Sequence, residues 1–422
     1  MEIGVMRNVL VIGDSYVDTE FFDTNTRWFH VGQEPPDLDL IACRKLCLAA
    51  QFDVEQYDKK LLEIFLFCNE IIGEFGKIDY VIANTEYSIL CGAAVRDHYG
   101  IIGRRLSDVA AFRNKFLMKS ALARSGEVVT SRFVGGELLA KQGMNAVSKV
   151  FMPSDYPLVL KATCQAGSRY VYVVEDAVEL SQKMQELQTL GVEYLVEQFV
   201  DAPVIHIDGV CRDGELLFVC ASRYVDDCYA WQHEKIAMSS VLIDDPALQK
   251  TIVQFTQRTL SSLSARDLVF HLEAFLLSDE RLVFLEIASR PGGAAIAPCI
   301  KNIYGVDLLK ENFNVEVDAP SILHSSGFLD AHVSKSGGWI VLPLPEMSWC
   351  EVLSVQGDPP LGEHVVWRKV VAAGTRYNVD YFEDPAVGMF VVRHLSAAQV
   401  ELSIQQIKQG FSIEVLRLDQ SL

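Results

Sequence analysis

The sequence predicts an α/β protein that begins with a parallel α/β unit and ends in a strand-rich unit. Three observations favour this class. Strand and helix patterns alternate over the first hundred residues, two apolar strands joined by a turn follow residue 271, and glycine- and proline-rich turns separate short apolar runs beyond residue 315. The chain has 422 residues, which is too long for one ordinary hydrophobic core and indicates several domains.

The composition narrows the classes of function. Half of the residues are apolar and 22% are charged, as in folded soluble proteins. The net charge of −19 disfavours nucleic acid or an anionic membrane surface as the main partner. The N-terminus lacks the pattern of a signal peptide, and the apolar stretch 61–72 is too short and too interrupted to span a bilayer. Ten cysteines without metal-ligand spacing then favour a cytoplasmic protein with reduced, mostly buried thiols.

The N-terminal unit places a carboxylate at the end of a predicted strand. An apolar run over 8–13, an amphipathic helical stretch over 59–75 and a second apolar run over 78–83 read as strand, helix and strand. Glu86 follows the second strand, and ligands of open parallel sheets bind outside such strand ends. Glu86 is therefore a candidate substrate contact. The alternative is that it caps the helix that begins there.

Two further segments have the residue types of a phosphate site. A strand ends in Lys161 and is followed by a small-residue turn that contains Gly167 and Ser168. An ammonium group supplies charge and the N–H groups of a turn supply donors, so this pattern suits a phosphate. An ordinary hairpin is the alternative, because many hairpins contain Gly-Ser. The helical stretch 107–123 carries Lys115 on a mainly basic surface.

The predicted hairpin after residue 271 carries the chemistry of a metal and phosphoryl site. Glu273 and Glu286 on adjacent antiparallel strands can converge on one divalent cation, and Arg290 can face the same point. The glutamates could instead be the exposed face of the hairpin. Both lie in very apolar runs, however, where an unpaired carboxylate is costly. Arg290 could also pair structurally with either glutamate, and His271 is expected to pack near the site, because magnesium prefers oxygen ligands.

The order of these motifs resembles the ATP-grasp superfamily, and within it the carboxylate–amine ligases. The resemblance covers nearly the whole chain and is most specific between residues 115 and 293. The motifs that carry it are Arg113-Asn114-Lys115, Pro157-Leu158-Val159-Leu160-Lys161, Gly167-Ser168, Glu197-Gln198-Phe199-Val200, His271-Leu272-Glu273 and Glu286-Ile287-Ala288-Ser289-Arg290. It implies an N-terminal parallel α/β domain, two ATP-grasp subdomains that sandwich ATP and a strand-rich C-terminal domain, over residues 1–110, 111–200, 201–315 and 316–422.

The resemblance also implies a role for each motif. ATP would bind with Mg²⁺, or with Mn²⁺ as an alternative. The implied nucleotide-binding residues are Lys115, Lys161, Gly167, Ser168, Glu197, Gln198, Phe199 and Val200; the implied metal ligands are Glu273 and Glu286; and the implied catalytic residues are Arg290, Gly292 and Gly293. The stretch from Glu197 to Val200 matches the family's hinge between the two ATP-grasp subdomains. Glycines at the last two positions allow the backbone to approach the reacting oxygens closely.

Two positions depart from the family pattern. The family usually places a metal-binding Asn two residues after the second glutamate, where this chain has Ala288. The number of bound magnesium ions, one or two, therefore stays open. Val204 stands where family members often carry a glutamate for the ribose hydroxyls. His206 and Asp208 are candidate substitutes, and the alternative is that they serve the exterior face of their own strand.

A polar segment over 226–240 is expected to be an irregular, mobile loop that closes over the site. The candidate substrate contacts in this segment are Trp231, His233 and Lys235, and Arg223 just before it is a fourth. For Trp231 and His233, the alternative is an ordinary solvated loop. The small-residue turn over 165–168 is a second expected lid, because an acyl phosphate must be protected from water.

The favoured function is an ATP-dependent ligase that joins two amino acids through an acyl phosphate and releases ADP and phosphate. The strand-rich unit from residue 337 resembles the extra domain of the L-amino acid ligases. The expected partners are amino acids, with no nucleic acid and no membrane, and a homodimer is one alternative for the oligomeric state. Two other hypotheses stay open: an ATP-grasp enzyme of primary metabolism that uses ammonia, formate or bicarbonate, and a non-catalytic nucleotide-binding module.

Overall fold

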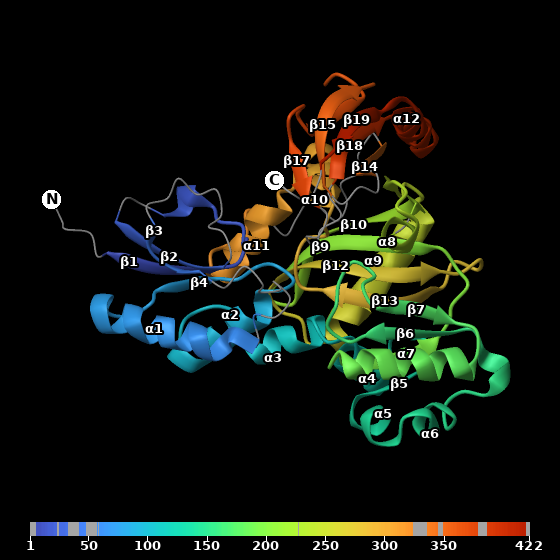
Figure 1. The fold of residues 1–422 in the computed structure, drawn as a ribbon, viewed down its shortest axis with the longest axis horizontal. Helices are drawn as coiled ribbons and strands as arrows, with labels where there is room; N and C mark the ends of the chain where they lie inside the picture. The colour runs from blue at the N-terminus through green and yellow to red at the C-terminus, as the bar shows by residue number, and fades with distance from the viewer. Residues whose placement is uncertain are drawn as a thin grey trace.

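The structure is a computed structural model that describes residues 6–22, 25–32, 42–47, 57, 59–226, 228–323, 336–344, 349–378 and 386–418 of the chain. Within these ranges the strands form four β-sheets that pack against helices (Figure 1). Each helix in this part of the chain is too short or too polar to cross a membrane.

The N-terminal unit is a parallel sheet between two helical layers. Its elements are β1 (Arg7–Ile12), η1 (Thr19–Phe21), β2 (Thr26–Gly32), β3 (Ala42–Cys47), α1 (Leu61–Phe75), β4 (Tyr80–Ile82), α2 (Ile89–Tyr99) and, much later in the chain, α11 (Leu308–Glu316). The strand order is β3-β2-β1-β4. On one face, Ile64 of α1 and Cys91 of α2 share a core with Leu10. Phe313 of α11 and the adjacent Val317 cover the other face (Figure 1).

The second unit is a four-stranded antiparallel sheet with a helix packed on it. Its elements are α3 (Leu106–Val109), η3 (Ala110–Phe112), α4 (Lys115–Ser125), β5 (Phe133–Gly135), α5 (Gly136–Gln142), α6 (Met144–Val147), η4 (Pro153–Asp155), β6 (Leu158–Ala162), β7 (Val171–Val174), α7 (Ala177–Thr189) and β8 (Tyr194–Gln198). The strand order is β5-β8-β6-β7. Asn114 caps α4 by accepting hydrogen bonds from the backbone N–H groups of Phe116 and Leu117, which fixes Lys115 at the start of the helix.

The third unit contains the predicted hairpin, at one edge of a large sheet. Its elements are β9 (Val204–Arg212), β10 (Glu215–Asp226), α8 (Cys228–Glu234), β11 (Met238–Leu242), α9 (Pro246–Ser262), β12 (Leu268–Leu276), β13 (Leu282–Ala288) and α10 (Ile296–Tyr304). Both faces of the sheet are covered. Ile207 packs in one core with Leu260 of α9, whereas Val210 packs in another with Ile300 of α10.

The C-terminal unit continues the same sheet. Its elements are β14 (Ser336–Pro343), β15 (Trp349–Gln356), β16 (Val365–Val370), β17 (Arg376–Asn378), β18 (Ala386–His394), α12 (Ala397–Gly410) and β19 (Ser412–Arg417). The large sheet has the order β13-β12-β9-β10-β11-β14-β18-β16, so it crosses the domain boundary expected near residue 315. A Cβ at Gly338 would lie 2.5 Å from the carbonyl oxygen of Ser240, so glycine permits the close pairing of β14 with β11.

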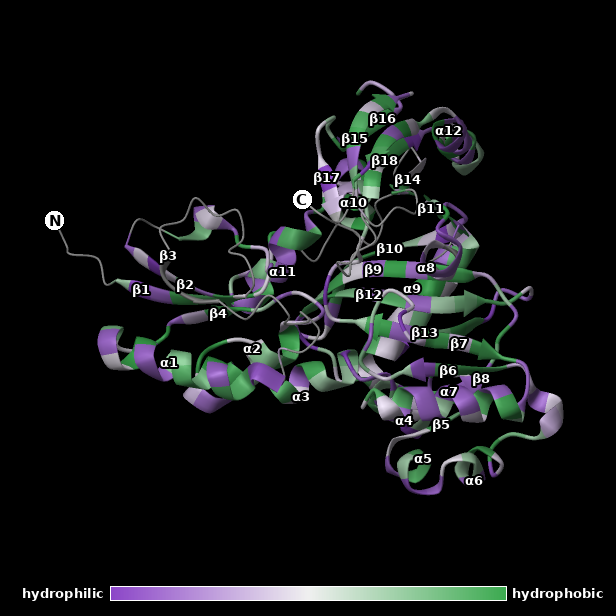
Figure 2. Cartoon of the chain, viewed as in Figure 1, coloured by the Kyte–Doolittle hydropathy of each residue, from purple (hydrophilic) through white to green (hydrophobic). Residues whose placement is uncertain are grey.

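The hydropathy of the chain follows these layers. In Figure 2 apolar residues concentrate in the central strands β9, β10 and β12, whereas the outer helices α7 and α12 carry many hydrophilic residues. This distribution is the one expected for a sheet with both faces buried beneath amphipathic helices.

Candidate active site

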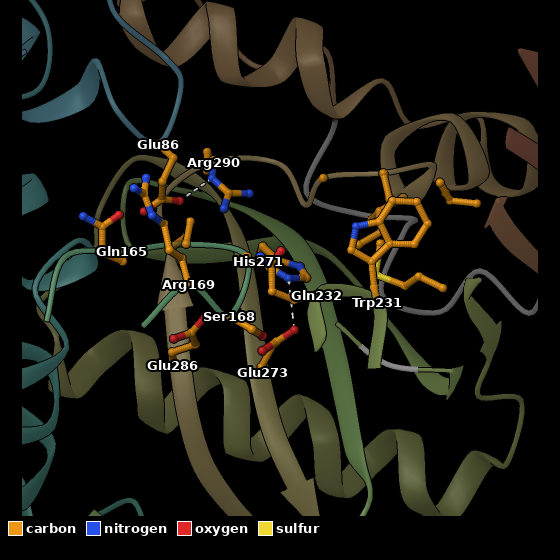
Figure 3. Close-up of a pocket in the computed structure, with 18 of the residues that line it drawn as sticks. Glu86, Gln165, Ser168, Arg169, Trp231, Gln232, His271, Glu273, Glu286 and Arg290 are labelled. Carbon is orange, nitrogen blue, oxygen red and sulfur yellow. Dashed lines mark hydrogen bonds and ion pairs between the residues drawn. The ribbon is translucent and has the colours of Figure 1, made fainter. Parts of the chain in front are cut away.

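The two glutamates of the hairpin lie opposite each other on neighbouring strands. Glu273 of β12 pairs in register with Glu286 of β13, and a β-bulge follows immediately after them. Figure 3 shows the two carboxylates side by side. The hydroxyl of Tyr224 donates a hydrogen bond to Glu273 Oε1 over 2.9 Å. Magnesium prefers oxygen ligands and keeps several waters, so these two side chains fit that ion and would hold it.

A buried histidine–aspartate network lies beside Glu273. His271 Nδ1 lies 2.8 Å from Asp208 Oδ1, and His206 Nδ1 lies 2.6 Å from Asp208 Oδ2. Burial alone would lower the pKa of His271, but Asp208 and Glu273 outweigh it and raise that pKa to about 10. The ligand atoms of His206, Asp208 and His271 lie close enough together to hold a metal ion. The Nδ1 atoms of both histidines, however, already face Asp208. His271 is also the register partner of Ala288.

The backbone after Arg290 packs directly on this network. A Cβ at Gly292 would lie 2.8 Å from His271 Nδ1 and 2.9 Å from Asp208 Oδ1. Glycine is therefore required at position 292 for close approach rather than for a left-handed backbone. Gly293 differs, because a Cβ there would meet nothing within 4 Å. Gly293 lines the larger of the two cavities described below.

Three charged side chains form a buried cluster between α4 and the two inner strands, β6 and β8, of the four-stranded antiparallel sheet. Lys161 Nζ lies 2.5 Å from Glu197 Oε1, and Lys119 Nζ lies 2.9 Å from Glu197 Oε2. Burial alone would raise the pKa of Glu197, but the two lysines outweigh it and bring that pKa to about 2. Glu197 is therefore ionised across the physiological range, whereas burial lowers the pKa of Lys119.

Lys115 connects the turn over residues 165–168 to the hairpin. Its ammonium group donates a hydrogen bond to the carbonyl oxygen of Gln165 over 2.6 Å and lies 3.1 Å from Glu286 Oε2. In this turn, Gly167 and Ser168 have φ values of 61° and 58°. The second value is uncommon for a residue with a side chain and marks a constrained turn.

Two cavities meet at the glutamate pair. The smaller, of about 470 Å³, is lined by Lys161 and by all four predicted hinge residues from Glu197 to Val200. The larger, of about 790 Å³, is lined by Glu86, Arg113 and Arg290 among others. Both volumes lie in the range of small-molecule sites. The residues that line both are Lys115, Gln165, Ala166, Ser168, Arg169, Tyr224, Glu273 and Glu286.

Glu86 joins the N-terminal unit to the wall of the larger cavity. Arg290 Nε donates a hydrogen bond to Glu86 Oε2 (dashed in Figure 3), and Arg113 Nη1 lies 3.1 Å from Glu86 Oε1. Burial alone would raise the pKa of Glu86, but the two arginines outweigh it and bring that pKa to about 2. The arrangement places one carboxylate between two guanidinium groups at the cavity wall.

A second buried cluster fixes the relative position of Glu86 and Arg290. Arg96 and Arg104 both pair with Glu316 of α11, which also accepts a hydrogen bond from the N–H of Ala83 over 3.1 Å. Arg104 Nη1 donates a hydrogen bond to the carbonyl oxygen of Ser289 over 2.9 Å. The strand before Glu86 and the residue before Arg290 are therefore held by the same three side chains.

No protein-family model matches the chain. The chain is similar to the L-arginine-specific L-amino acid ligase of Bacillus subtilis, at 24% identity over 57% of this chain and 58% of the relative. That match spans less than two thirds of the relative's length. The chain is also similar to the alanine–anticapsin ligase of the same organism, at 22% identity over 84% of this chain and 81% of the relative.

The fold is similar to that of several solved structures. The L-amino acid ligase of Bacillus licheniformis matches with a TM-score of 0.70 at 17% identity, over 98% of this chain and 99% of the other. The biotin carboxylase domain of Hydrogenobacter thermophilus 2-oxoglutarate carboxylase, solved with MgADP, matches with a TM-score of 0.68 at 13% identity, over 98% and 92% of the two chains. This protein has the ATP-grasp fold. It is related to the L-amino acid ligases, and the predicted fold class is confirmed.

Within this ATP-grasp fold, the structure brings together most of the predicted site residues. Those that line one or both cavities are Glu86, Lys115, Lys161, Gly167, Ser168, Glu197, Gln198, Phe199, Val200, Trp231, Glu273, Glu286, Arg290 and Gly293. Val204 also lines the smaller cavity, at the position that departs from the family pattern. Gly292 packs behind this set, against His271.

Other candidates lie elsewhere. Arg223 lines neither cavity and faces Glu401 of α12, 3.1 Å away. His233 is exposed and packs against Tyr229, and Lys235 lines neither cavity. The expectation of an irregular loop over 226–240 is wrong for residues 226, 228–234 and 238–240, which lie in β10, α8 and β11.

The proposed ribose substitutes also lie away from the nucleotide side. His206 and Asp208 are each 1% exposed and line neither cavity, because β9 is an interior strand with both faces covered. Asp201, a carboxylate that sequence reasoning did not consider, lines the smaller cavity together with Val204. Sequence reasoning also missed Lys119 as a partner of Glu197. Its spacing of four residues from Lys115 on a helix was the pattern that could have indicated it.

Proposed function

We propose that the protein is an ATP-dependent ligase that joins the carboxylate of one amino acid to the amine of another. One observation carries this proposal: two cavities meet at Glu273 and Glu286. The smaller lies beside the buried side chains of Lys119 and Lys161, and the wall of the larger carries one carboxylate between two guanidinium groups. The first would bind ATP and the second the amino acids, so the transferred phosphoryl group would lie at their junction.

The smaller cavity has the chemistry that ATP requires. The hinge residues and apolar side chains such as Phe275 and Leu285 offer a slot for the adenine. Lys115 and Lys161 would pair with phosphate oxygens, and Glu273 and Glu286 would hold Mg²⁺. The metal would supply charge neutralisation at the phosphates, while the chain's own residues position the reactants.

The larger cavity has the chemistry that an α-amino acid requires. The guanidinium groups of Arg113 and Arg290 can bind a carboxylate through paired hydrogen bonds, and the Glu86 carboxylate can accept from an ammonium group. In the structure these three side chains form ion pairs with one another. A zwitterion could replace these contacts with equivalent ones, so little charge would be left unpaired when the site fills.

The proposed reaction has two steps. A carboxylate oxygen of the first amino acid attacks the γ-phosphorus of ATP, the bond to the β–γ bridging oxygen breaks, and ADP leaves. The neutral amine of the second amino acid attacks the acyl carbon, loses a proton, and phosphate leaves as the amide forms. Arg290 would stabilise the developing negative charge, and the turn at Gly167 and Ser168 would exclude water. The related amino acid ligases support this assignment.

Release of ADP in the presence of amino acids tests the proposal. The full chain, ATP and Mg²⁺ are incubated with pooled amino acids, ADP is measured by a coupled assay, and products are identified by mass spectrometry. We expect one amide formed for each ADP. Tight ATP binding without stimulation by any amino acid would support a non-catalytic module instead. ADP release that needs bicarbonate, formate or ammonia would support the primary-metabolism alternative.

A further inference from the structure

The larger cavity is polar at one side and apolar at the other. Glu86 and Arg290 lie at the polar side, and Figure 3 shows Trp231 across His271 from them. Trp231 belongs to a group of large apolar side chains that line the cavity and share one hydrophobic core cluster. We call this group the apolar chamber; its residues are Tyr224, Trp231, Met238, Trp339, Val341 and Met389.

The register of the large sheet builds the floor of the apolar chamber. Met238 of β11 is the register partner of Val341 on β14, and Val341 is the partner of Met389 on β18. These three side chains therefore form a row on one face of three adjacent strands. Trp339, two residues before Val341, points to the same face, and its ring centroid lies 6.3 Å from that of Tyr224.

The carboxylates that line the cavity are already committed, and of its cations Lys369, the register partner of Met389, is exposed. Among the described residues, the carboxylates that line it are Glu86, Glu273 and Glu286. Glu86 faces two arginines, Glu273 accepts from Tyr224, and Glu286 faces Lys115. The apolar chamber itself consists of aromatic, thioether and aliphatic groups. Among these six residues, the indole N–H of Trp339 is a buried donor without a hydrogen-bond partner. A charged side chain placed there would lose its hydration without gaining an opposite charge.

We infer that the amino acid bound in the larger cavity carries a large, uncharged, apolar side chain, which enters the apolar chamber. This inference rests on the proposed function and narrows its substrate class. Burying such a side chain strengthens binding by roughly 10- to 100-fold over leaving it in water. Two methionines in the chamber are flexible enough to fit several shapes, so phenylalanine, leucine and methionine should all be accepted.

Steady-state kinetics with single amino acids tests the inference. The full chain with ATP and Mg²⁺ is given L-alanine as a constant second substrate, together with L-phenylalanine, L-leucine, L-methionine, L-glutamate or L-arginine. We expect kcat/KM for the three apolar amino acids to exceed the values for glutamate and arginine by about 10-fold or more. A preference for arginine or glutamate, with amide still formed, overturns the inference but leaves the proposed function standing. Failure of every pair to give ADP or amide removes both.

Two variants connect the preference to the apolar chamber. Met389→Ala and Trp231→Ala each remove part of the wall from a half-buried position. Each should lower the ratio of kcat/KM for phenylalanine over alanine by about 10-fold, mainly through KM for phenylalanine. Leu402→Ala is the matched control, because Leu402 lies on α12 in the same unit and is 60% exposed. An unchanged ratio in both chamber variants, with melting temperatures like that of Leu402→Ala, overturns the inference.

Discussion

The two cavities share the glutamate pair but are built differently. The smaller cavity takes most of its walls from residues 159–204, with β12 and β13 beside them. The larger cavity takes its walls from residues as far apart as Glu86 and Met389. The proposed nucleotide site is therefore largely local in the chain, whereas the proposed substrate site depends on the assembly of the whole fold.

The charges of the two cavities also differ in burial. Lys119, Lys161 and Glu197 at the smaller cavity are each at most 3% exposed and pair with one another. Arg290 at the larger cavity has a side chain that is 22% exposed. Substitutions at the first cluster should therefore affect stability most, and substitutions at the second should affect turnover.

The largest effect is expected where the two cavities meet. Glu286→Ala removes one of the two proposed metal ligands, so turnover should be abolished and Mg²⁺-dependent ATP binding lost. ADP release and calorimetric titration with MgATP measure both. Glu215→Ala, which removes an exposed carboxylate from the same sheet, is the control and should behave as the parent protein. Near-normal activity of Glu286→Ala would contradict the proposal that Glu286 binds Mg²⁺.

The buried cluster of the smaller cavity should matter most for folding. Glu197→Ala leaves Lys119 and Lys161 buried without their carboxylate, which should lower the free energy of unfolding by about 3–5 kcal/mol. Denaturant unfolding followed by circular dichroism measures this change. Glu193→Ala, at an exposed position just before the same strand, should change it little. Equal stability of the two variants would mean that Glu197 does not pair with the two lysines in solution.

The same cluster should make the free energy of unfolding depend on pH. Because the pKa of Glu197 falls from an ordinary 4.5 to about 2 in the folded state, its stabilising contribution is present above pH 4.5 and is lost as pH falls toward 2. Glu197→Gln lacks this titration, so its free energy of unfolding should fall less between pH 4.5 and pH 2 than that of the parent. Parallel pH profiles for the two proteins would contradict the assignment.

At the larger cavity, a charge substitution should act on turnover. Arg290→Ala should lower kcat by about 100-fold or more while leaving ATP affinity largely intact, as expected for a group that stabilises developing charge. Single-turnover rates and ATP titration separate the two effects. Arg281→Ala, at the exposed turn of the same hairpin, is the control. A large loss of ATP binding would instead assign Arg290 a ground-state or structural role.

The smallest effect tests the contact behind the site. Gly292→Ala places a Cβ within 3 Å of His271 and Asp208, which should lower the free energy of unfolding by about 1–3 kcal/mol. Gly293→Ala introduces the same methyl group into open space, so its stability should match the parent. If both variants unfold at the same denaturant concentration, the loop is free to move away from the histidine.

The sequence predicts the smaller cavity better than the larger one, for a physical reason. The stretch from Glu197 to Val200 and the strand end at Lys161 are local patterns, and both line the smaller cavity. The partner of Arg223 is Glu401, 178 residues later, and nothing near Arg223 indicates it. The inward direction of Asp208 likewise depends on the strands that flank β9 and the helices over them.

The apolar chamber was not predicted for the same reason. Its floor depends on the pairing of β11 with β14 across the expected domain boundary. Trp231 was a candidate, but Trp339 and Met389 lie in apolar runs that resemble any buried strand. Only the register of the large sheet brings them to one face.

The position of α11 has a consequence for synthesis of the chain. Glu316 follows Ala83, its partner on the N-terminal sheet, by 233 residues. At ordinary translation rates this separation corresponds to roughly 10–50 s, during which Val9, Val11 and Trp28 lack the helix that covers them. The nascent N-terminal unit should therefore bind chaperones until α11 emerges, and a chain that ends before residue 308 should aggregate although its whole parallel sheet is present.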